Sequence, residues 1–264
     1  MIKLIVSDMD GSLLTSKNEL PPDFFEVLQE LHNRDIMFVV ASGRSYTTLY
    51  DNFAPKSDEI DYIADNGTCI VENGEITYEN ILSKSYVTKI VKACDDIEGL
   101  HIILCGSKGP YIKQETGIFL DEINRYYKSK TIVDDLTAVS DNIFKIGIYD
   151  TLGARQNSYK ILSEKFSGSL AVVVSGNNWT DVMNTDVNKG EALLRIQQRQ
   201  NISKDETMAF GDYFNDVEML TNAKYSFVMK NSISEMKKFG NFVAESNDEY
   251  GVIKAIKEYA LNYK

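Results

Sequence analysis

The chain has 264 residues, of which 43% are hydrophobic and 25% are charged, the composition of an ordinary globular protein with a sizeable core. Its net charge of −11 argues against general nucleic-acid binding, which needs basic patches, but permits a small phosphorylated ligand. Because no run approaches the ~20 apolar residues of a membrane span and no signal-peptide pattern occurs, we expect a cytoplasmic protein with no membrane partner. Its three scattered cysteines predict buried, reduced thiols.

Short apolar runs rich in β-branched residues recur in the first and last parts of the chain. They occupy residues 2–7, 36–42, 62–65, 207–210 and 225–229. Continuous apolar runs of this length predict strands buried on both faces, as in a parallel sheet. Apolar residues at helical spacing predict helices between them, over 21–34, 190–200 and 216–223. This alternation predicts an α/β fold with a doubly wound, mostly parallel sheet.

The middle of the chain has a different pattern. Residues 83–185 are more polar and more aromatic, with a hairpin expected at 101–113, helices at 117–129 and 153–166, and strands at 143–150 and 170–184. This is an α+β pattern placed within the α/β pattern. We therefore predict a core of residues 1–82 and 186–264, interrupted by an inserted α+β cap domain of residues 83–185.

Small, acidic, amide or hydroxyl residues follow four of the predicted strands. In chain order they are Asp8 and Asp10, then Ser42, Gly43 and Arg44, then Asn66 and Gly67, then Gly211, Asp212, Asn215 and Asp216. Ligands of open parallel sheets bind outside the carboxyl ends of the strands. The four groups are therefore predicted to converge on one site.

Four aspartates dominate this predicted site. Asp8 and Asp10 point to the same side of an extended chain, and Asp212 and Asp216 can add two more carboxylates. Each alone could be a helix cap or a turn residue, but an unpaired cluster would cost on the order of several kcal/mol. Mg²⁺ removes that cost, because it binds carboxylate, water and phosphate oxygens. One carboxylate then remains available as a nucleophile that forms an acyl phosphate.

Attack on a phosphate dianion also needs positive charge and hydrogen-bond donors. Lys189, in "NKGEAL", is expected at a loop-to-helix junction, where it can point inward, although a lysine alone is more often solvated. Ser42 and the backbone N–H groups of Gly43 and Arg44 can cradle phosphoryl oxygens at a helix start. Ser42 can also act as an N-cap.

These residues resemble a known family. "DMDGSLL", "SGR", "NKG" and "GDYFND" are similar, in order and context, to the four motifs of the haloacid dehalogenase superfamily. "DNGT" and the mid-chain insert resemble its Cof-type phosphatases, which carry a large α/β cap between motifs two and three. Ser12 and Ser42 stand where threonine is common, and both keep a hydroxyl group.

The resemblance implies roles for the core residues. Asp8 would be the nucleophile, and Asp10 would protonate the leaving oxygen and then activate water. Mg²⁺ would be held by the Asp8 carboxylate, the Asp10 carbonyl and the Asp212 carboxylate, with Asp216 supporting the metal waters or Lys189. The phosphoryl group would be bound by Ser42, Gly43, Arg44, Lys189 and Asn215, of which Ser42 and Lys189 also take part in catalysis.

The predicted function is Mg²⁺-dependent hydrolysis of a small phosphomonoester, such as a sugar phosphate, through an aspartyl phosphate. A phosphomutase of the same superfamily and a phospho-acceptor signalling module are the alternatives. A P-loop NTPase and a dinucleotide-binding enzyme are disfavoured, because neither GxxxxGK[ST] nor GxGxxG after a strand occurs. Within the cap, the candidates for substrate contact are Tyr111, Tyr126, Tyr127 and Trp179, although aromatic residues are more often core.

Overall fold

The computed structural model describes residues 1–127 and 130–262. They form two compact units: Met1–Ser42, Leu49–Thr77 and Asn188–Lys264 make up the first, and Gly43–Thr48 and Tyr78–Val187 the second. These bounds differ from the predicted 82/83 and 185/186, and they also group Gly43–Thr48 with the inserted segment. The assignment of catalysis to one part and substrate choice to the other stays a prediction. Within the described ranges, no helix is long and apolar enough to cross a membrane.

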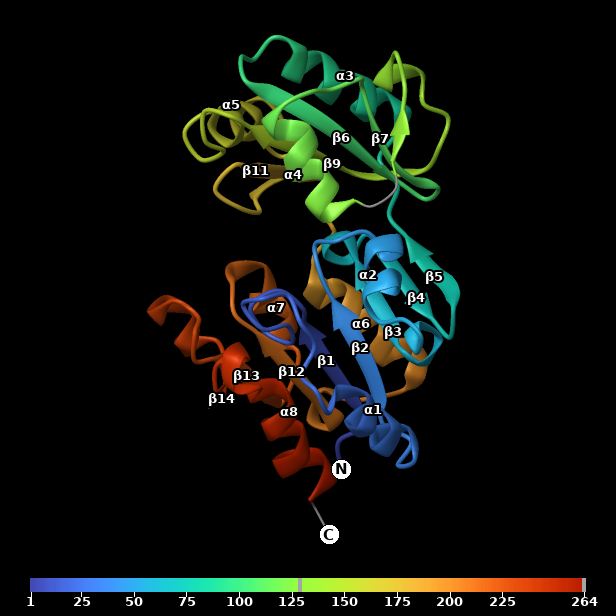
Figure 1. Ribbon diagram of the computed structural model, residues 1–264, viewed down its shortest axis with the longest axis vertical. Helices are drawn as coiled ribbons and strands as arrows, with labels where there is room; N and C mark the ends of the chain where they lie inside the picture. Colours follow the sequence, from blue (N-terminus) through green and yellow to red (C-terminus); the bar gives the residue numbers. More distant parts are fainter. Residues whose placement is uncertain (128–129, 263–264) are drawn as a thin grey trace. The chain divides into compact units, whose positions relative to one another are not determined.

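The first unit is built on an eight-stranded sheet (Figure 1). Its order is β14 (Phe242–Ala244), β13 (Tyr225–Met229), β12 (Thr207–Gly211), β1 (Leu4–Asp8), β2 (Met37–Ala41), β3 (Asp61–Ala64), β4 (Cys69–Glu72) and β5 (Glu75–Glu79). The strands from β14 to β3 are parallel, and β4 runs antiparallel to β3. The mostly parallel sheet is thereby confirmed.

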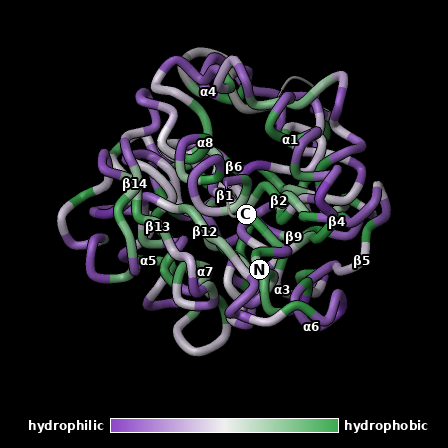
Figure 2. The backbone as a smooth tube through the Cα atoms, turned by 90° about the horizontal axis from the view of Figure 1, so that it is seen from below, coloured by the Kyte–Doolittle hydropathy of each residue, from purple (hydrophilic) through white to green (hydrophobic). Residues whose placement is uncertain are grey.

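The apolar sequences of the central strands explain their position. All five residues of β1 and of β12 are buried, as strands covered on both faces require. Figure 2 shows largely hydrophobic backbone in the region of the central strands and hydrophilic loops around it. The parallel register pairs Asp8 with Ala41 of β2, so the residue that follows Ala41 emerges beside the end of β1.

Helices cover both faces of this sheet. α1 (Phe24–His32) contacts the helical segment Lys257–Leu261 that continues α8 (Gly251–Ile256), whereas α6 (Lys189–Gln200) packs beside α7 (Val217–Thr221). α1 buries Phe24, Val27, Leu28 and Leu31, the residues whose spacing predicted it. A further helix, α2 (Tyr46–Asn52), follows β2. The doubly wound α/β fold is confirmed.

The second unit contains a six-stranded sheet. Its order is β10 (Ala171–Val174), β11 (Trp179–Met183), β9 (Ile143–Asp150), β6 (Leu100–Gly106), β7 (Gly109–Ile112) and β8 (Thr131–Ile132), antiparallel except between β7 and β8. α3 (Lys84–Asp95) and α5 (Ser158–Lys165) contribute to the hydrophobic core on one face, and α4 (Ile118–Tyr126) contributes to the core on the other. The α+β character predicted for this segment is confirmed.

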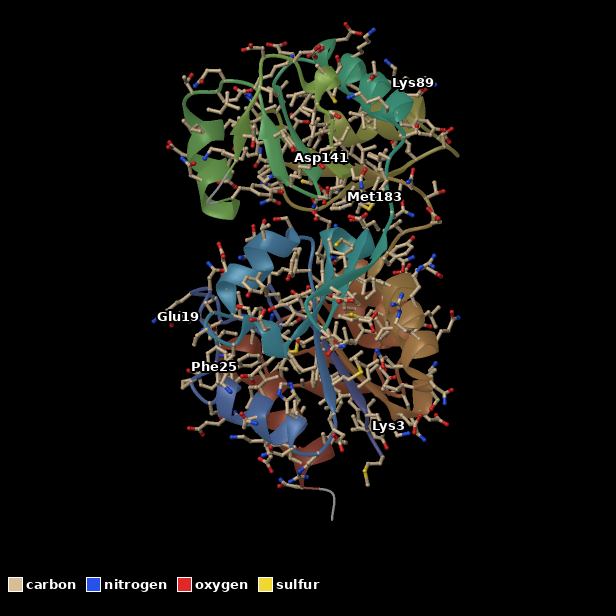
Figure 3. The ribbon with its side chains drawn as sticks, turned by 90° about the vertical axis from the view of Figure 1, so that its right-hand side faces the viewer. Lys3, Glu19, Phe25, Lys89, Asp141 and Met183 are labelled. Carbon is tan, nitrogen blue, oxygen red and sulfur yellow. The ribbon has the colours of Figure 1, made fainter. Side chains whose placement is uncertain are left out.

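The predicted hairpin at 101–113 is present as β6 and β7, and Asp141 holds its turn (Figure 3). The Asp141 carboxylate accepts hydrogen bonds from the Ser107 hydroxyl (2.7 Å), the Lys108 N–H (2.9 Å) and the Tyr111 hydroxyl (3.0 Å). Partial burial acts to raise the pKa of Asp141, but these hydrogen bonds outweigh it and lower the pKa. The turn is therefore anchored by an ionised carboxylate.

A buried ion pair lies on β9 and β11. The Lys145 ammonium is 3.3 Å from Asp181 Oδ2, and it donates a hydrogen bond to the carbonyl oxygen of Gly43 at 2.6 Å. Both side chains are almost fully buried, which these charges tolerate because they are paired.

The cysteines are buried thiols, as predicted. Cys69, Cys94 and Cys105 are all free and buried. Burial, reinforced by the nearby Asp95 carboxylate, raises the pKa of Cys94 to about 12. A thiol with so high a pKa is a poor nucleophile, so Cys94 is unsuited to covalent chemistry.

Candidate active site

The carboxyl ends of four neighbouring parallel strands bring the predicted residues to one edge of the first unit's sheet. The strands stand in the order β12, β1, β2, β3, and Asp212, Asp8, Ser42 and the segment 65–67 occur where they end. This is the edge at which open parallel sheets bind their ligands. The predicted convergence of the four strand ends follows from the sheet order.

Lys189 is the central cation of this edge. Its side chain is fully buried, and its ammonium donates to Asp8 Oδ1 at 2.5 Å and to Asp216 Oδ1 at 2.7 Å. Burial alone would lower the pKa of Lys189, but the carboxylates of Asp216 and Asp8 hold that pKa above its ordinary value. Lys189 is therefore a charged, buried lysine, and the surface position weighed above is wrong.

Lys189 is the first residue of α6, and the start of this helix fixes the position of its side chain. Asn188 is the N-cap, and its side-chain oxygen accepts a hydrogen bond from the Glu191 N–H at 2.8 Å. Gly190 follows, and a Cβ there would lie 2.4 Å from the Cβ of Glu218, so the first turn of α6 can approach α7 only because that side chain is missing.

Three carboxylates surround this lysine. Oxygen atoms of Asp8, Asp212 and Asp216 all lie within 4.8 Å of one another, a grouping that fits a hard divalent cation. Asp8 Oδ2 is buried and has no hydrogen-bond partner in the part of the chain that the structure describes. Because a buried carboxylate oxygen is costly without a partner, Asp8 Oδ2 is well placed to ligate a metal ion or to attack an electrophile.

The carboxylates differ in how they are held. Asp216 Oδ2 accepts the backbone N–H groups of Asp212 (3.0 Å) and Tyr213 (3.1 Å), while Oδ1 accepts from Lys189. Both oxygens of Asp216 are thus engaged within the protein. This arrangement suits the supporting role expected for Asp216 better than direct metal ligation.

The clustering raises two pKa values. Burial raises the pKa of Asp8 well above its ordinary value. The charge of Lys189 opposes this shift, and the charges of Asp216 and Asp212 add to it. Burial and the Asp216 charge likewise raise the pKa of Asp212 to about 7, with a smaller contribution from Asp10. Without a bound metal ion, therefore, the three carboxylates resist full ionisation near neutral pH, even beside Lys189.

A tight turn after Asp10 brings the first strand's loop against Asp212. Gly11 has φ +85°, and a Cβ at this position would lie 2.4 Å from Asp212 Oδ2. The Gly11 carbonyl accepts a hydrogen bond from the Asn231 side chain at 2.8 Å, which holds the turn. Asp10 itself is exposed, and its exchange of protons with a substrate or water stays a prediction.

The predicted phosphoryl-binding residues are placed less uniformly. Ser42 is buried and its N–H donates to the Ile63 carbonyl (2.9 Å), whereas Gly43 and Arg44 belong to the second compact unit. Asn215 donates from its side-chain amide to Asn66 Oδ1 at 3.2 Å. Grouping Gly43 and Arg44 with the carboxylates therefore stays a prediction.

The aromatic candidates of the second unit have structural partners. Tyr127 is buried in the hydrophobic core under α4, and the Tyr111 hydroxyl donates a hydrogen bond to the Asp141 carboxylate. Trp179 packs against that same core, and its indole N–H lies 3.5 Å from Glu122 Oε1. The side chain of Tyr126 lies outside the described part of the chain. A role in substrate contact stays a prediction for all four.

Comparison with known proteins identifies the family of this chain. Residues 5–256 match the model of a family described as haloacid dehalogenase-like hydrolase. The chain is 31% identical, over 97% of its length and 95% of the relative's, to 5-amino-6-(5-phospho-D-ribitylamino)uracil phosphatase YbjI of Escherichia coli. It is 26% identical to phosphatase YwpJ of Bacillus subtilis, covering 97% of this chain and 99% of that one.

A solved structure shares the fold over the full chain. SMU.1108c of Streptococcus mutans superposes with a TM-score of 0.91 at 29% identity, covering 99% of this chain and 100% of that one. The motifs quoted above lie within the matched residues 5–256. The chain therefore belongs to the haloacid dehalogenase-like hydrolase family, and it is a phosphatase of the Cof type.

Proposed function

We propose that this phosphatase hydrolyses small phosphomonoesters, such as sugar phosphates, in a Mg²⁺-dependent reaction through an aspartyl phosphate on Asp8. The observation that carries the proposal is the Asp8 carboxylate. Lys189 holds its Oδ1 at 2.5 Å, while Oδ2 is buried with no hydrogen-bond partner among the described residues. One oxygen is thus fixed by a cation and the other remains available for the substrate or the metal ion.

The residues of the first unit divide the reaction between them. A carboxylate oxygen of Asp8 attacks phosphorus, the bond to the leaving oxygen breaks, and Asp10 supplies the proton to that oxygen. Asp10 then takes a proton from water, whose oxygen attacks phosphorus, releases phosphate and restores Asp8. Mg²⁺, held by the carboxylates of Asp8 and Asp212 and the Asp10 carbonyl, would neutralise the negative charges that the reaction brings together.

Binding of the phosphoryl group falls to Lys189, Ser42 and Asn215, with Gly43 and Arg44 after β2. Catalysis then depends on positioning and charge neutralisation, because phosphoryl transfer asks little further chemistry of the protein. We assign the choice of leaving group to the inserted segment. Candidate substrates are sugar phosphates, pyridoxal phosphate and 5-amino-6-(5-phospho-D-ribitylamino)uracil, the compound in the name of the Escherichia coli relative.

Phosphate release tests this proposal directly. We expect the purified protein with added Mg²⁺ to hydrolyse p-nitrophenyl phosphate or acetyl phosphate, to hydrolyse at least one phosphomonoester of a metabolite panel, and to lose activity in EDTA. Asp8→Asn protein purified in parallel controls for contaminating phosphatases. A folded protein that released no phosphate from any member of the panel would contradict the proposal.

The raised pKa of Asp212 predicts how Mg²⁺ stabilisation depends on pH. Burial raises this pKa to about 7, so the metal-free fold loses stability as pH rises from about 4 through 7 and the buried carboxylate ionises. Mg²⁺ requires the ionised form, so the increase in melting temperature from saturating Mg²⁺ should be larger at about pH 8 than at about pH 6.

Thermal unfolding with MgCl₂ and with EDTA at both pH values measures this difference. Asp212→Asn provides the control, since its dependence on pH should flatten. An increase in melting temperature that is equal at both pH values in the wild type would be evidence against Asp212 as a ligand.

A further inference from the structure

The segment between β3 and β4 has an unusual backbone. Asp65, Asn66 and Gly67, here called the 65–67 loop, have φ values of +48°, +59° and +101°. Residues other than glycine rarely adopt this left-handed backbone conformation. Two of them in a row cost stability and persist only where the surroundings enforce the conformation. Such strain is often found beside functional sites.

Asn66 links two strand ends of the proposed active site. Its backbone N–H donates to the carbonyl oxygen of Ser42 at 2.9 Å, after β2. Its side-chain oxygen accepts the hydrogen bond from Asn215, after β12, at 3.2 Å. Asn66 is buried, so both hydrogen bonds lie away from bulk water, where the low dielectric strengthens them.

Gly67 extends the same loop to the helix that carries the buried lysine. A Cβ on Gly67 would lie 2.4 Å from the carbonyl oxygen of Asn188, the N-cap residue immediately before Lys189. Backbone therefore packs against backbone where α6 begins. Only glycine permits both the left-handed conformation and this approach.

We propose that the 65–67 loop is a positioning element that fixes Ser42, Asn215 and the start of α6 relative to one another. Asn66 is its positioning residue and acts through Asn215 and Ser42, and Gly67 sets the point from which Lys189 reaches Asp8. This inference rests on the proposed function. It explains the strained backbone, since only the left-handed turn presents the Asn66 N–H and side chain to two different strands at once.

The first test removes the Asn66 carboxamide while keeping the left-handed conformation accessible. Asn66→Gly relieves the cost of a positive φ, which offsets the lost hydrogen bond, so the variant should fold with a melting temperature close to that of the wild type. Its kcat/KM for p-nitrophenyl phosphate should fall about tenfold, because Asn215 is no longer held. Asn73→Gly makes the same change at φ +52° in the exposed β4–β5 turn, and its kcat/KM should equal that of the wild type.

A double-mutant cycle separates positioning from general destabilisation. If Asn66 acts through Asn215, Asn66→Gly combined with Asn215→Ala should lose little more kcat/KM than Asn215→Ala alone. Losses that simply multiply, or an Asn66→Gly enzyme with wild-type kcat/KM, would overturn this inference while leaving the proposed function intact. A wild-type enzyme with no phosphatase activity would instead remove the proposed function.

The second test compares two glycines with positive φ. Gly67→Ala places a Cβ against Asn188, whereas Gly74→Ala, at φ +76°, meets nothing within 4 Å. Both variants carry the conformational cost, but only Gly67→Ala displaces the start of α6. We expect kcat to fall more than tenfold for Gly67→Ala and to stay within about twofold of wild type for Gly74→Ala. Equal kcat values for the two would contradict the role of Gly67, and the Asn66 variants decide the case if Gly67→Ala fails to fold.

Discussion

Asp8→Asn is expected to lower kcat by about 10⁴-fold or more, the largest effect of any single substitution in this chain. The amide cannot form the acyl phosphate, and no other carboxylate occupies its position. Asp216 has both oxygens engaged by Lys189 and by backbone N–H groups. Neither can Asp10 replace Asp8, because it is exposed and lies two residues beyond the strand. The loss should therefore appear in kcat for every substrate.

The same substitution should leave the metal-free protein folded. Burial and neighbouring carboxylates raise the pKa of Asp8, which means that its ionised form destabilises the metal-free fold at neutral pH. Asparagine removes that charge but keeps an oxygen that can accept from Lys189. We expect the melting temperature in EDTA to be equal to or higher than that of the wild type, and the increase on adding Mg²⁺ to shrink.

Steady-state kinetics, unfolding curves and intact mass spectrometry check these expectations. Wild-type protein quenched during turnover of acetyl phosphate should carry one added phosphoryl group, and Asp8→Asn should carry none. Asp205→Asn is the matched control, since Asp205 has a side chain that is 76% exposed. A folded Asp8→Asn enzyme with full turnover would refute the assignment of the nucleophile.

Much of the core could be predicted because its strands have a simple sequence pattern. Apolar runs located β1, β2, β3, β12 and β13 to within about two residues, and the rule for parallel sheets then brought their carboxyl ends together. The expectation that Asp8 and Asp212 lie at one edge of the sheet followed from this rule, whereas the order of the strands came from the structure. Lys189 was a candidate from its motif, but its burial needed the structure, because a lysine at the start of a helix has no feature of its own that distinguishes a buried amine from a solvated one.

The contacts of the 65–67 loop were beyond prediction for a different reason. Asn66 and Gly67 were recognised as residues that follow a strand, but their partners are about 25 to 150 residues distant in sequence. A left-handed asparagine followed by glycine is a common turn. This turn differs from the exposed one at 73–74 in the burial of Asn66, in the bonds of Asn66 to Ser42 and Asn215, and in the packing of Gly67 on Asn188.

The second unit shows how an alternating pattern can mislead. Along β9, Phe144, Ile146 and Ile148 alternate with Lys145 and Gly147, which indicates a solvated second face. That face instead carries Tyr149, which belongs to the core under α4, and Lys145, which is buried against Asp181 and the Gly43 carbonyl. The partner lies on β11, whose register places Asp181 opposite Gly147. The pairing of β9 with β11, which periodicity does not determine, therefore gives the buried Lys145 its partner.

Lys189→Met is expected to destabilise the metal-free protein by about 3–5 kcal/mol at neutral pH, because it leaves two buried carboxylates without their cation. Methionine fills much of the same volume, so loss of packing contributes little. The loss should diminish as pH falls and Asp8 becomes protonated, since the pKa of Asp8 is already raised. Saturating Mg²⁺ should restore part of the stability, because it supplies positive charge to the same carboxylates.

Urea unfolding in EDTA and in MgCl₂, across pH, measures each of these effects. Lys3→Met is the matched control, and Lys3 is labelled in Figure 3. Its ammonium pairs with Glu206 at 2.7 Å, but its side chain is 52% exposed, so its removal should leave stability close to wild type. Because Lys189 also holds Asp8 and is proposed to bind the phosphoryl group, kcat should fall at least about 10²-fold even where Mg²⁺ restores the fold. A Lys189→Met protein as stable as Lys3→Met in EDTA would show that the carboxylates do not depend on this lysine, and the charge balance proposed for the site would be wrong.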